Sequence, residues 1–494
     1  MPPVERTLAP PGRFPPDGAF SALRRLFMRG LTTFAVLAAG LALAGVSGEP
    51  VRALRPQAAP PGYGSWVDWL GDYDGDGERD LVIGAWGGGS ERGGVQVILS
   101  QAGPMWIYGP ELGDGFGVFA GSVGDVTGDG RDDLAVGAPY GRAGGAWDTG
   151  VLWVYSGELL ELRSAIPHMG LTGELDSGRF GWSACGIGDR DGDGVGDLAV
   201  GAPTAHGFDG EVHLFGGSAD GVSPWRRVVA NDEVSKGEFG IVVRSVGDLN
   251  GDDSVDFAVG VPLKRIWQGG DPRLPQVWVY LGGAERSLSP SYKLYGTDWN
   301  RLFGWHLAPA GDVDGDGYGD LIVGAPRKRS APPESWIQGT DQGKVWIYRG
   351  GEVPDTTPYV RLAGENPDDA FGNSVIGLGD IDRDGFADLA VGAPEHDTGG
   401  DNAGAVYLFR GGAPMDTVPD LIYRGAIAGA RLGYSLSSPD RPEGAGPVHG
   451  AAGAIDGSYA WIYRFFAEDE TEPLPGGRLE HLLQCPREDS GVVD

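Results

Sequence analysis

The chain has 494 residues and a formal net charge of −31, which disfavours nucleic acid as a partner because a phosphate backbone repels so acidic a surface. Its 89 Gly and 36 Pro approach a low-complexity composition, but 41% hydrophobic residues, with 15 Trp, 16 Tyr and 17 Phe, suffice for a large core. The two cysteines, Cys185 and Cys485, exclude a disulfide-stapled scaffold.

The N-terminal region has the features of a secretory signal. Arg24, Arg25 and Arg29 precede the apolar run 31–46, and small residues follow it. We predict that residues 1–48 are a signal peptide, with Met28 as a candidate true start. The mature chain is then expected to be secreted, periplasmic or on the cell surface, without a membrane span. An uncleaved N-terminal anchor is the alternative, although this apolar run is short for a span.

A cassette repeats between residues 54 and 466. Each copy begins with Phe-Gly or Tyr-Gly, has an Asp nine residues later, and reaches a Gly-Ala-Pro-like segment twelve residues further on. The spacings are constant in six copies, which begin at Tyr63, Phe116, Phe180, Phe239, Phe303 and Phe371. A seventh copy, from Leu432 to Ala454, keeps the spacing but has Arg441–Ala445 in place of an acidic loop. Constant cassettes joined by variable loops are typical of a repeat architecture.

Each repeat predicts four short strands. Runs of β-branched and aromatic residues bounded by Gly-rich turns occur at 151–155, 277–280, 345–348, 405–409 and 461–463. Four-stranded antiparallel units of this length suit the blades of a propeller. We therefore predict an all-β fold, a seven-bladed β-propeller over residues 51–466, followed by an acidic C-terminal tail at 467–494.

The predicted ring has to close between its first and last repeats. Leu54 lies nine residues before Tyr63, as Leu362 lies nine residues before Phe371. We therefore predict that Val51–Leu54 is the outer strand of the last blade, so that an N-terminal strand closes the ring. The tail segment Leu479–Leu483 is the alternative closing strand.

The acidic loops have the composition of calcium sites. In the first loop, Asp72, Asp74, Asp76 and Asp80 occupy positions 1, 3, 5 and 9, and Gly77 at position 6 permits a sharp turn. Hard oxygen donors in a flexible loop are what Ca²⁺ binds, and four like charges this close repel one another without a cation. A backbone carbonyl at position 7 would add another oxygen.

Six loops share this arrangement, so we predict up to six structural Ca²⁺ ions, each bridging two adjacent strands. In chain order the predicted ligands are Asp72, Asp74, Asp76, Glu78 and Asp80; Asp125, Thr127, Asp129, Arg131 and Asp133; Asp189, Asp191, Asp193, Val195 and Asp197; Asp248, Asn250, Asp252, Ser254 and Asp256; Asp312, Asp314, Asp316, Tyr318 and Asp320; and Asp380, Asp382, Asp384, Phe386 and Asp388.

Two rival interpretations of these loops are weaker. An EF-hand needs a Glu at position 12 and flanking helices, but position 12 is Ile or Val inside a predicted strand. Asx turns without a metal also use Asp and Gly, but six loops in register favour metal binding. Thr127 in the second loop predicts weaker binding, and Asn250 with Asp253 makes the fourth loop a less regular site.

Taken together, the Phe-Gly corners, acidic loops and Gly-Ala-Pro segments resemble FG-GAP repeats, and the chain is similar to the seven-bladed propeller of integrin α subunits. The resemblance covers about 54–466 and is carried by segments such as Phe116-Gly117 to Pro139 and its companions. It implies calcium in the Asp-rich loops and a role as an adhesion or ligand-binding module. The chain has six acidic loops where integrins usually have three or four, and it lacks leg domains, a C-terminal span and Asn-x-Ser/Thr sequons. We therefore expect a free-standing secreted relative, of bacterial origin.

Loops between the second and third strands should lie on the face opposite the acidic loops, because antiparallel strands alternate in direction. Arg, Lys and Trp gather in these loops, and such residues are frequent at binding sites. The candidate ligand-face residues are Arg142, Trp147, Lys264, Arg265, Trp267, Arg327, Lys328, Arg329 and Trp336. We expect this face to bind an anionic extracellular protein or polysaccharide. The alternative is that each aromatic side chain merely covers its own loop.

The sequence has no recognisable catalytic motif. Neither Gly-x-Ser-x-Gly nor His-Glu-x-x-His occurs, and the seven His are dispersed. We therefore expect a module that is not an enzyme, with no catalytic residue and no organic cofactor. The alternatives are an extracellular propeller enzyme, such as a polysaccharide lyase or hydrolase, and a glycan-binding lectin. The oligomeric state is not predicted.

Overall fold

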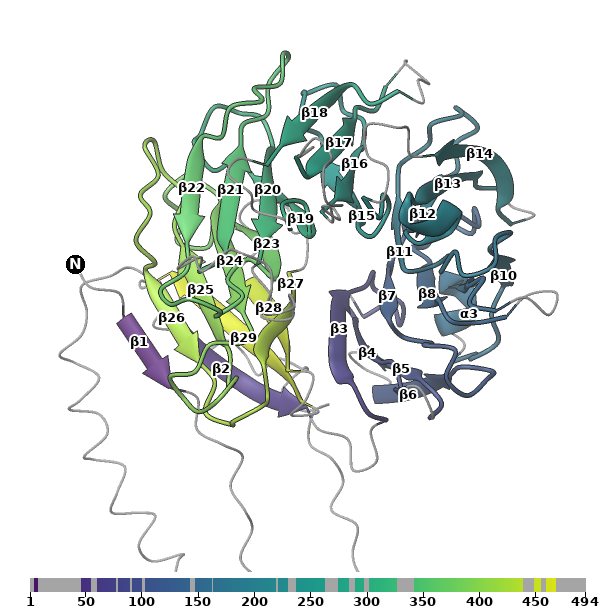
Figure 1. Ribbon diagram of the computed structural model, residues 1–494, viewed down its shortest axis with the longest axis horizontal. Helices are drawn as coiled ribbons and strands as arrows, with labels where there is room; N and C mark the ends of the chain where they lie inside the picture. Colours follow the sequence, from purple (N-terminus) through teal and green to yellow (C-terminus); the bar gives the residue numbers. More distant parts are fainter. Residues whose placement is uncertain are drawn as a thin grey trace, which may run out of the picture.

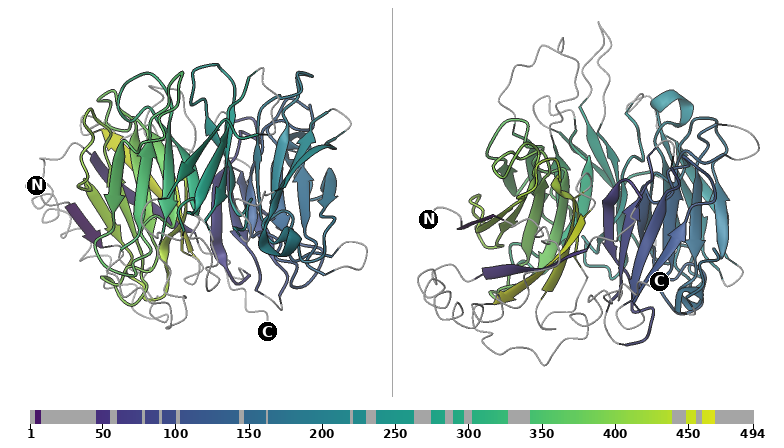
Figure 2. Two further views of the ribbon diagram at one scale, coloured as in Figure 1. Left: turned by 45° about the horizontal axis from the view of Figure 1, so that its top comes forward. Right: turned by 90° about the horizontal axis from the view of Figure 1, so that it is seen from below.

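The structure, a computed structural model, describes residues 4–7, 46–54, 60–76, 79–88, 91–99, 103–142, 147–161, 163–218, 221–229, 237–262, 274–283, 289–296, 302–326, 342–438, 448–454 and 459–467. These residues form an all-β molecule in which small sheets are arranged around a common centre (Figure 1). The views in Figure 2 show the sheets standing side by side with their faces packed together. This arrangement is a β-propeller.

Four antiparallel strands form each of six sheets in the described part of the chain. Their strands are β3 (Tyr63–Trp69), β4 (Leu81–Ala85), β5 (Gly94–Leu99) and β6 (Gly103–Tyr108); β7 (Phe119–Ser122), β8 (Leu134–Ala138), β9 (Val151–Tyr155) and β10 (Met169–Thr172); β11 (Ser183–Gly186), β12 (Leu198–Ala202), β13 (Glu211–Gly216) and β14 (Ser223–Val229); β15 (Val243–Gly247), β16 (Asp256–Val261), β17 (Gln276–Tyr280) and β18 (Tyr292–Tyr295); β19 (His306–Gly311), β20 (Asp320–Ala325), β21 (Lys344–Tyr348) and β22 (Val360–Ala363); and β27 (Leu432–Ser437), β28 (Val448–Ala454), β29 (Tyr459–Ala467) and β2 (Val46–Leu54).

A further sheet departs from the predicted blade. It contains β23 (Ser374–Gly379), β24 (Asp388–Ala393), β25 (Ala405–Phe409) and β26 (Leu421–Arg424), and a fifth strand, β1 (Val4–Thr7), pairs in parallel with β26. The prediction of seven four-stranded blades is therefore wrong in number, because six sheets have that form. The physical reason is that the outer edge of β26 offers unpaired backbone groups, which β1 satisfies.

The prediction for the closing strand is confirmed and extended. Strand β2 pairs antiparallel with β29, with Leu54 opposite Ala460 and Ala53 opposite Trp461. It begins at Val46 rather than Val51, and its register shifts between Pro50 and Arg52. An N-terminal strand thus completes the sheet of the last repeat, whereas the alternative closing segment 479–483 lies outside the described residues.

The first strand of each repeat lies nearest the centre of the molecule. These strands contact one another in the closed order β3, β7, β11, β15, β19, β23, β27 and back to β3. The second strands carry the Val, Leu and Ala of the cassette and are fully buried, as β8 (LAVGA) and β20 (DLIVGA) show. Because both faces of these strands pack against neighbouring sheets, their sequences are continuously apolar instead of alternating.

In the third to sixth repeats the Phe-Gly corner packs against the third strand of its own sheet. Phe371 is fully buried and packs edge-on against Tyr407 and Phe409, and Phe303 packs in the same way against Trp346. Aromatic pairs in this geometry add to the energy of area burial. The aromatic third strands predicted from the sequence are therefore the packing partners of the Phe-Gly corners.

The described helices are short. They are α3 (Gly157–Glu161) and α4 (Ala205–Phe208), and neither is long and apolar enough to cross a bilayer. The apolar run 31–46 of the predicted signal lies, apart from Val46, outside the described residues. Cys185 is buried in β11, as expected for a small hydrophobic side chain, and Cys485 is outside the described part.

Candidate metal centres

The Asp at position 9 of each acidic loop is the most buried member of its loop. Asp133, Asp197, Asp256 and Asp320 are completely inaccessible to solvent, and Asp80 and Asp388 are 1% exposed. One carboxylate oxygen accepts the backbone N–H of position 2, as in Ile381 to Asp388 at 2.9 Å. The same bond occurs in all six loops, at 2.8–2.9 Å.

The second oxygen of this Asp reaches the third strand of the same sheet. In five loops it accepts the N–H of the Gly that follows the strand, for example Gly411 to Asp388 at 3.0 Å and Gly217 to Asp197 at 3.0 Å. The position 9 carboxylate therefore ties the loop to the sheet through backbone hydrogen bonds. Sequence spacing identified these residues only as ligands, and this second role was missed.

The Asp at position 1 shapes the loop itself. Asp189 accepts N–H groups from Gly192, Asp193 and Gly194 at 2.6, 3.1 and 2.8 Å. The residue at position 5 accepts the N–H of position 7, as in Val195 to Asp193 at 2.9 Å. These are Asx-turn contacts, so the loops hold their carboxylates in place by local hydrogen bonds.

Three carboxylates converge in five of the six loops. In each group one oxygen per residue lies within 4.8 Å of the others. The groups are Asp72, Asp74 and Asp80; Asp125, Asp129 and Asp133; Asp189, Asp191 and Asp197; Asp312, Asp314 and Asp316; and Asp380, Asp382 and Asp388. Asp76, Asp193, Asp320 and Asp384, predicted as ligands in the same loops, lie outside these groups, and Glu78 is outside the described residues.

The fourth loop is built differently. Asp248, Asp252 and Asp256 do not form such a group among the described residues. Asn250 at position 3 donates from Nδ2 to Asp252 at 3.1 Å, while its buried Oδ1 has no hydrogen-bond partner in the described structure. Asp253 at position 6 has a φ of 62°, so it takes the left-handed conformation expected of the Gly it replaces. A buried amide oxygen without a donor is suited to a cation.

The second loop replaces an acid by a hydroxyl. Thr127 is 4% exposed, and its hydroxyl donates to Asp133 at 3.1 Å. Asp129 accepts the Ser156 hydroxyl at 2.5 Å and the Glu158 N–H at 3.1 Å, at the start of α3. Burial opposes ionisation of Asp129, but these hydrogen bonds hold its pKa below the usual range.

Arginines reach two of the candidate centres. Arg349 lies 2.5 Å from a carboxylate oxygen of Asp314, and Arg410 lies 3.1 Å from one of Asp382. Both arginines directly follow a third strand, β21 or β25. They offset part of the negative charge at position 3 in the fifth and sixth loops, and no motif in the sequence predicts these contacts.

The donor set fits a hard divalent cation. Burial raises the pKa of Asp388 to about 8, with the nearby Asp382 and Asp384 adding to the shift, and it raises the pKa of Asp320 to about 7. Burial and like charge also raise the pKa of Asp382 itself. A cation at the point of convergence would reverse this penalty on the ionised form, and the nearby oxygens are hard donors of the kind Ca²⁺ or Mg²⁺ accepts.

Neighbouring loops are linked to one another. The N–H of Gly196, in the third loop, donates to the carbonyl of Asp125 in the second at 2.9 Å. The N–H of Ala387, in the sixth loop, donates to the carbonyl of Asp312 in the fifth at 2.7 Å. The position of one loop therefore depends on the position of the preceding one.

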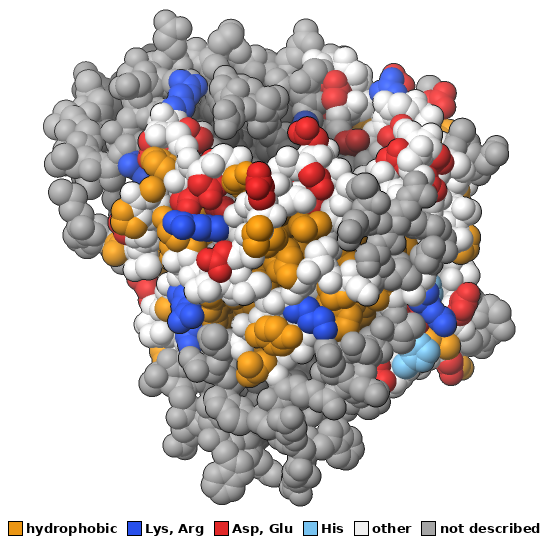
Figure 3. Space-filling model, turned by 90° about the horizontal axis from the view of Figure 1, so that it is seen from above, with side chains coloured by type: hydrophobic (Ala, Val, Ile, Leu, Met, Phe, Trp, Pro, Cys, Tyr) orange, Lys and Arg blue, Asp and Glu red, His pale blue; other side chains and the backbone are white. Residues whose placement is uncertain are grey.

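On the opposite face, the structure describes two of the predicted ligand-face residues. Trp147 is 60% exposed, and the guanidinium of Arg142 lies 3.4 Å from the centre of its ring. Lys264, Arg265, Trp267, Arg327, Lys328, Arg329 and Trp336 are outside the described residues. Figure 3 shows, on one side of the molecule, hydrophobic side chains interspersed with both acidic and basic ones.

Two polar clusters on histidines escaped the sequence analysis. Glu211 is 1% exposed and lies 2.8 Å from His213 and 3.1 Å from His206, with Arg227 at 3.6 Å. In the sequence, the only indication of this group is that His206, Glu211 and His213 lie close together along the chain.

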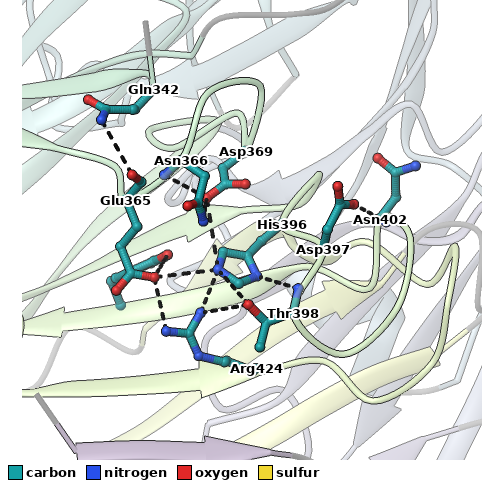
Figure 4. Close-up of polar contacts among 10 residues, drawn as sticks. Gln342, Glu365, Asn366, Asp369, His396, Asp397, Thr398, Asn402 and Arg424 are labelled. Carbon is teal, nitrogen blue, oxygen red and sulfur yellow. Dashed lines mark hydrogen bonds and ion pairs between the residues drawn. The ribbon is translucent and has the colours of Figure 1, made fainter. Parts of the chain in front are cut away.

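The second cluster surrounds His396, which has no solvent-accessible surface (Figure 4). Glu365 accepts hydrogen bonds from Nη2 of Arg424 at 2.9 Å and from the Tyr407 hydroxyl at 3.1 Å. Asp369 lies 3.8 Å from His396. Burial opposes ionisation of Glu365, but Arg424 holds its pKa below the usual range. The cluster ties the segment before Phe371 to β25 and β26, so its role is packing of the repeat.

Comparison with known proteins identifies the repeat. The FG-GAP repeat family matches residues 117–155, 180–215, 303–348 and 371–409. Integrin alpha-5 of Xenopus laevis is 35% identical over 189 residues, 38% of this chain and 16% of that protein. Integrin alpha-V of Gallus gallus is 32% identical over 228 residues (44% and 20%), and integrin alpha-IIb of Homo sapiens is 33% identical over 251 residues (49% and 22%). The chain thus spans less than a quarter of the length of these relatives.

Proposed function

We propose that this FG-GAP repeat β-propeller, which resembles integrin alpha subunits, is a secreted calcium-binding module for adhesion or ligand binding. The observation that carries the proposal is the convergence of three carboxylates within 4.8 Å in five loops of a chain with integrin alpha relatives. The predicted boundaries, 1–48 for the signal, 51–466 for the propeller and 467–494 for the tail, belong to this proposal; cleavage after residue 48 would remove β1 and the first residues of β2.

Calcium would act as a structural link. When bound, it supplies positive charge at the point where the carboxylates converge. The position 1 and position 3 carboxylates would hold it from the loop, and the position 9 carboxylate would connect it to the sheet through its bonds to backbone N–H groups. Since neighbouring loops are hydrogen-bonded, ordering of one loop supports the next.

The ligand would bind on the face opposite the acidic loops, where rigid strands present variable loops. An extracellular protein or polysaccharide is the proposed partner, and the acidity of the chain argues against nucleic acid. We propose a function other than catalysis, because His206 lies against the buried carboxylate of Glu211 and His396 lies 3.8 Å from the buried carboxylate of Asp369.

Two measurements test the proposal on the full chain. Calorimetric titration with Ca²⁺ should show saturable binding to several sites, and absence of heat and of any thermal stabilisation would contradict the calcium assignment. Arrays of extracellular matrix proteins and polysaccharides, probed in calcium and in chelator, should show calcium-dependent binding. A folded, calcium-loaded protein that binds no member of either array would contradict the ligand-binding role.

A further inference from the structure

A cluster of arginines and aromatic rings lies on the face opposite the acidic loops, where the second and third repeats meet. We call Tyr140, Arg142, Trp147, Arg179 and Trp182 the arginine–tryptophan patch. Arg142 stacks on Trp147 at 3.4 Å, and Arg179 lies 5.2 Å from the ring of Tyr140 and 5.8 Å from that of Trp182. Tyr140 and Trp182 contact each other edge to face, with centroids 6.2 Å apart.

The two halves of the patch form one surface. Arg179 donates its N–H to the carbonyl of Asp148 at 3.0 Å, and Asp148 directly follows Trp147. This backbone hydrogen bond therefore joins the loop after β8, which contains Asp148, to the segment with Arg179 that precedes the next repeat.

The exposed tryptophan is held rigidly. The backbone N–H of Trp147 donates to the Asp176 carboxylate at 2.8 Å, and its backbone carbonyl accepts the N–H of Ser177 at 2.8 Å. Trp147 nevertheless leaves 60% of its surface in solvent. A rigid, exposed aromatic ring loses little entropy on binding, which is the property of a binding anchor.

The patch also carries unpaired positive charge. Among the described residues, neither Arg142 nor Arg179 forms an ion pair, although the chain has a net charge of −31. A guanidinium stacked on an aromatic ring keeps its in-plane N–H donors free for a carboxylate. Two carboxylates adjoin the rings of the patch: Asp176 lies at the backbone N–H of Trp147, and Asp148 is near enough to Tyr140 to act on its hydroxyl.

We propose that the arginine–tryptophan patch binds an acidic polysaccharide that contains uronic acids. The apolar face of a pyranose ring stacks on Trp147, the sugar carboxylate meets the arginines, and the hydroxyls donate to Asp148 and Asp176. An acidic peptide has few hydroxyl donors for these two carboxylates, which disfavours a protein segment. The inference rests on the proposed ligand-binding function and deepens it.

The test uses the full calcium-loaded chain and a glucuronic-acid-containing hexasaccharide, with the same hexasaccharide after reduction of its carboxylates to alcohols as the paired probe. Binding should weaken by about tenfold or more for Trp147→Ala and for Arg142→Gln. It should weaken similarly when the reduced probe replaces the acidic one. Matched controls are Tyr295→Ala, which removes another aromatic that is 51% exposed, and Arg361→Gln, which removes an exposed arginine from β22. Both controls should bind as the parent does.

Several results would overturn the inference. Equal binding by Trp147→Ala and the parent would place the site elsewhere, and equal binding of both probes would remove the requirement for a carboxylate. Binding of an acidic peptide that depends on Trp147, without binding of the hexasaccharide, would assign the patch to a protein partner and leave the proposed function intact. Loss of binding to every member of the two arrays, with calcium stabilisation retained, would remove the ligand-binding function as well.

Discussion

The carbonyl oxygen of Gly64 lies against Gly453 so closely that a Cβ on Gly453 would stand 2.0 Å from it. The corresponding contact recurs between neighbouring repeats, for example between Gly181 and Gly137 at 2.0 Å. Because Gly64 belongs to the first repeat and Gly453 to the last, this contact lies where the ring closes. The two constant glycines of the cassette are therefore explained by an approach of backbones that leaves no room for a side chain.

Substitution at this contact should weaken the closure of the ring. Gly453→Ala should lower the free energy of unfolding by about 1–3 kcal/mol, since the new methyl group meets backbone and cannot be relieved by a rotamer change. Chemical unfolding in calcium measures the effect. Gly71→Ala is the control, because the three atoms nearest its Cβ would all belong to the Asp132 side chain, at 3.2–3.5 Å. Identical unfolding midpoints for both variants would show that the contact does not limit stability.

Calcium should raise the melting temperature of the full chain. A ligand at 100 times its Kd stabilises the native state by about 2.7 kcal/mol per site, so several sites together give a large shift. Scanning calorimetry in calcium and in chelator, at matched ionic strength, measures it. Sodium chloride at the same ionic strength controls for charge screening. Superimposable curves in calcium and chelator would contradict a structural role for the cation.

The constant cassette spacing was sufficient to predict much of the fold, because it fixes which residues share a strand. Position 12 of every acidic loop lies in a second strand, as Val391 does in β24. The spacing could not reveal β1, since its pairing depends on an edge supplied by Leu421–Arg424, far away in the sequence. Nor could it predict that Arg383 at position 4 takes a φ of 64°, where most of the loops have Gly.

The sequence predicts which carboxylates gather in each candidate site, but it does not predict which of them also bond to the backbone of the sheet. Asp197 and Asp191 look equivalent in sequence, yet Asp197 accepts the backbone N–H groups of Arg190 and Gly217, whereas Asp191 accepts that of Asp193 inside the loop. The partners of His396 were not predictable, because Glu365, in the segment after β22, and Arg424, in β26, come together with it only in the folded protein.

This division of roles predicts different responses to calcium removal. Asp197→Asn should destabilise the protein in chelator as well as in calcium. The NH2 group of Asn would face one of the two backbone N–H groups that Asp197 accepts, and this N–H would lose its acceptor at a cost of about 1–3 kcal/mol. Asp191→Asn should destabilise it only in calcium, since its effect is on the cation. Thermal unfolding of both variants under both conditions measures the difference. If Asp197→Asn behaved as the parent does in chelator, the proposed cross-link would be wrong.

The buried Glu211 predicts a dependence of stability on acidity. Burial opposes its ionisation, but hydrogen bonds from His213 and His206 and the charge of Arg227 hold its pKa below its ordinary value of 4.5. A carboxylate with a depressed pKa contributes stability above its unfolded pKa, and this contribution is lost as the pH falls through the folded pKa. The parent should therefore exceed Glu211→Gln in stability by about 1–3 kcal/mol near neutral pH, and the gap should close below about pH 4. Urea unfolding of both proteins in chelator across this range separates Glu211 from the acidic loops, which titrate equally in both. A gap of constant size at every pH would show that the loss comes from packing and not from the charge of Glu211.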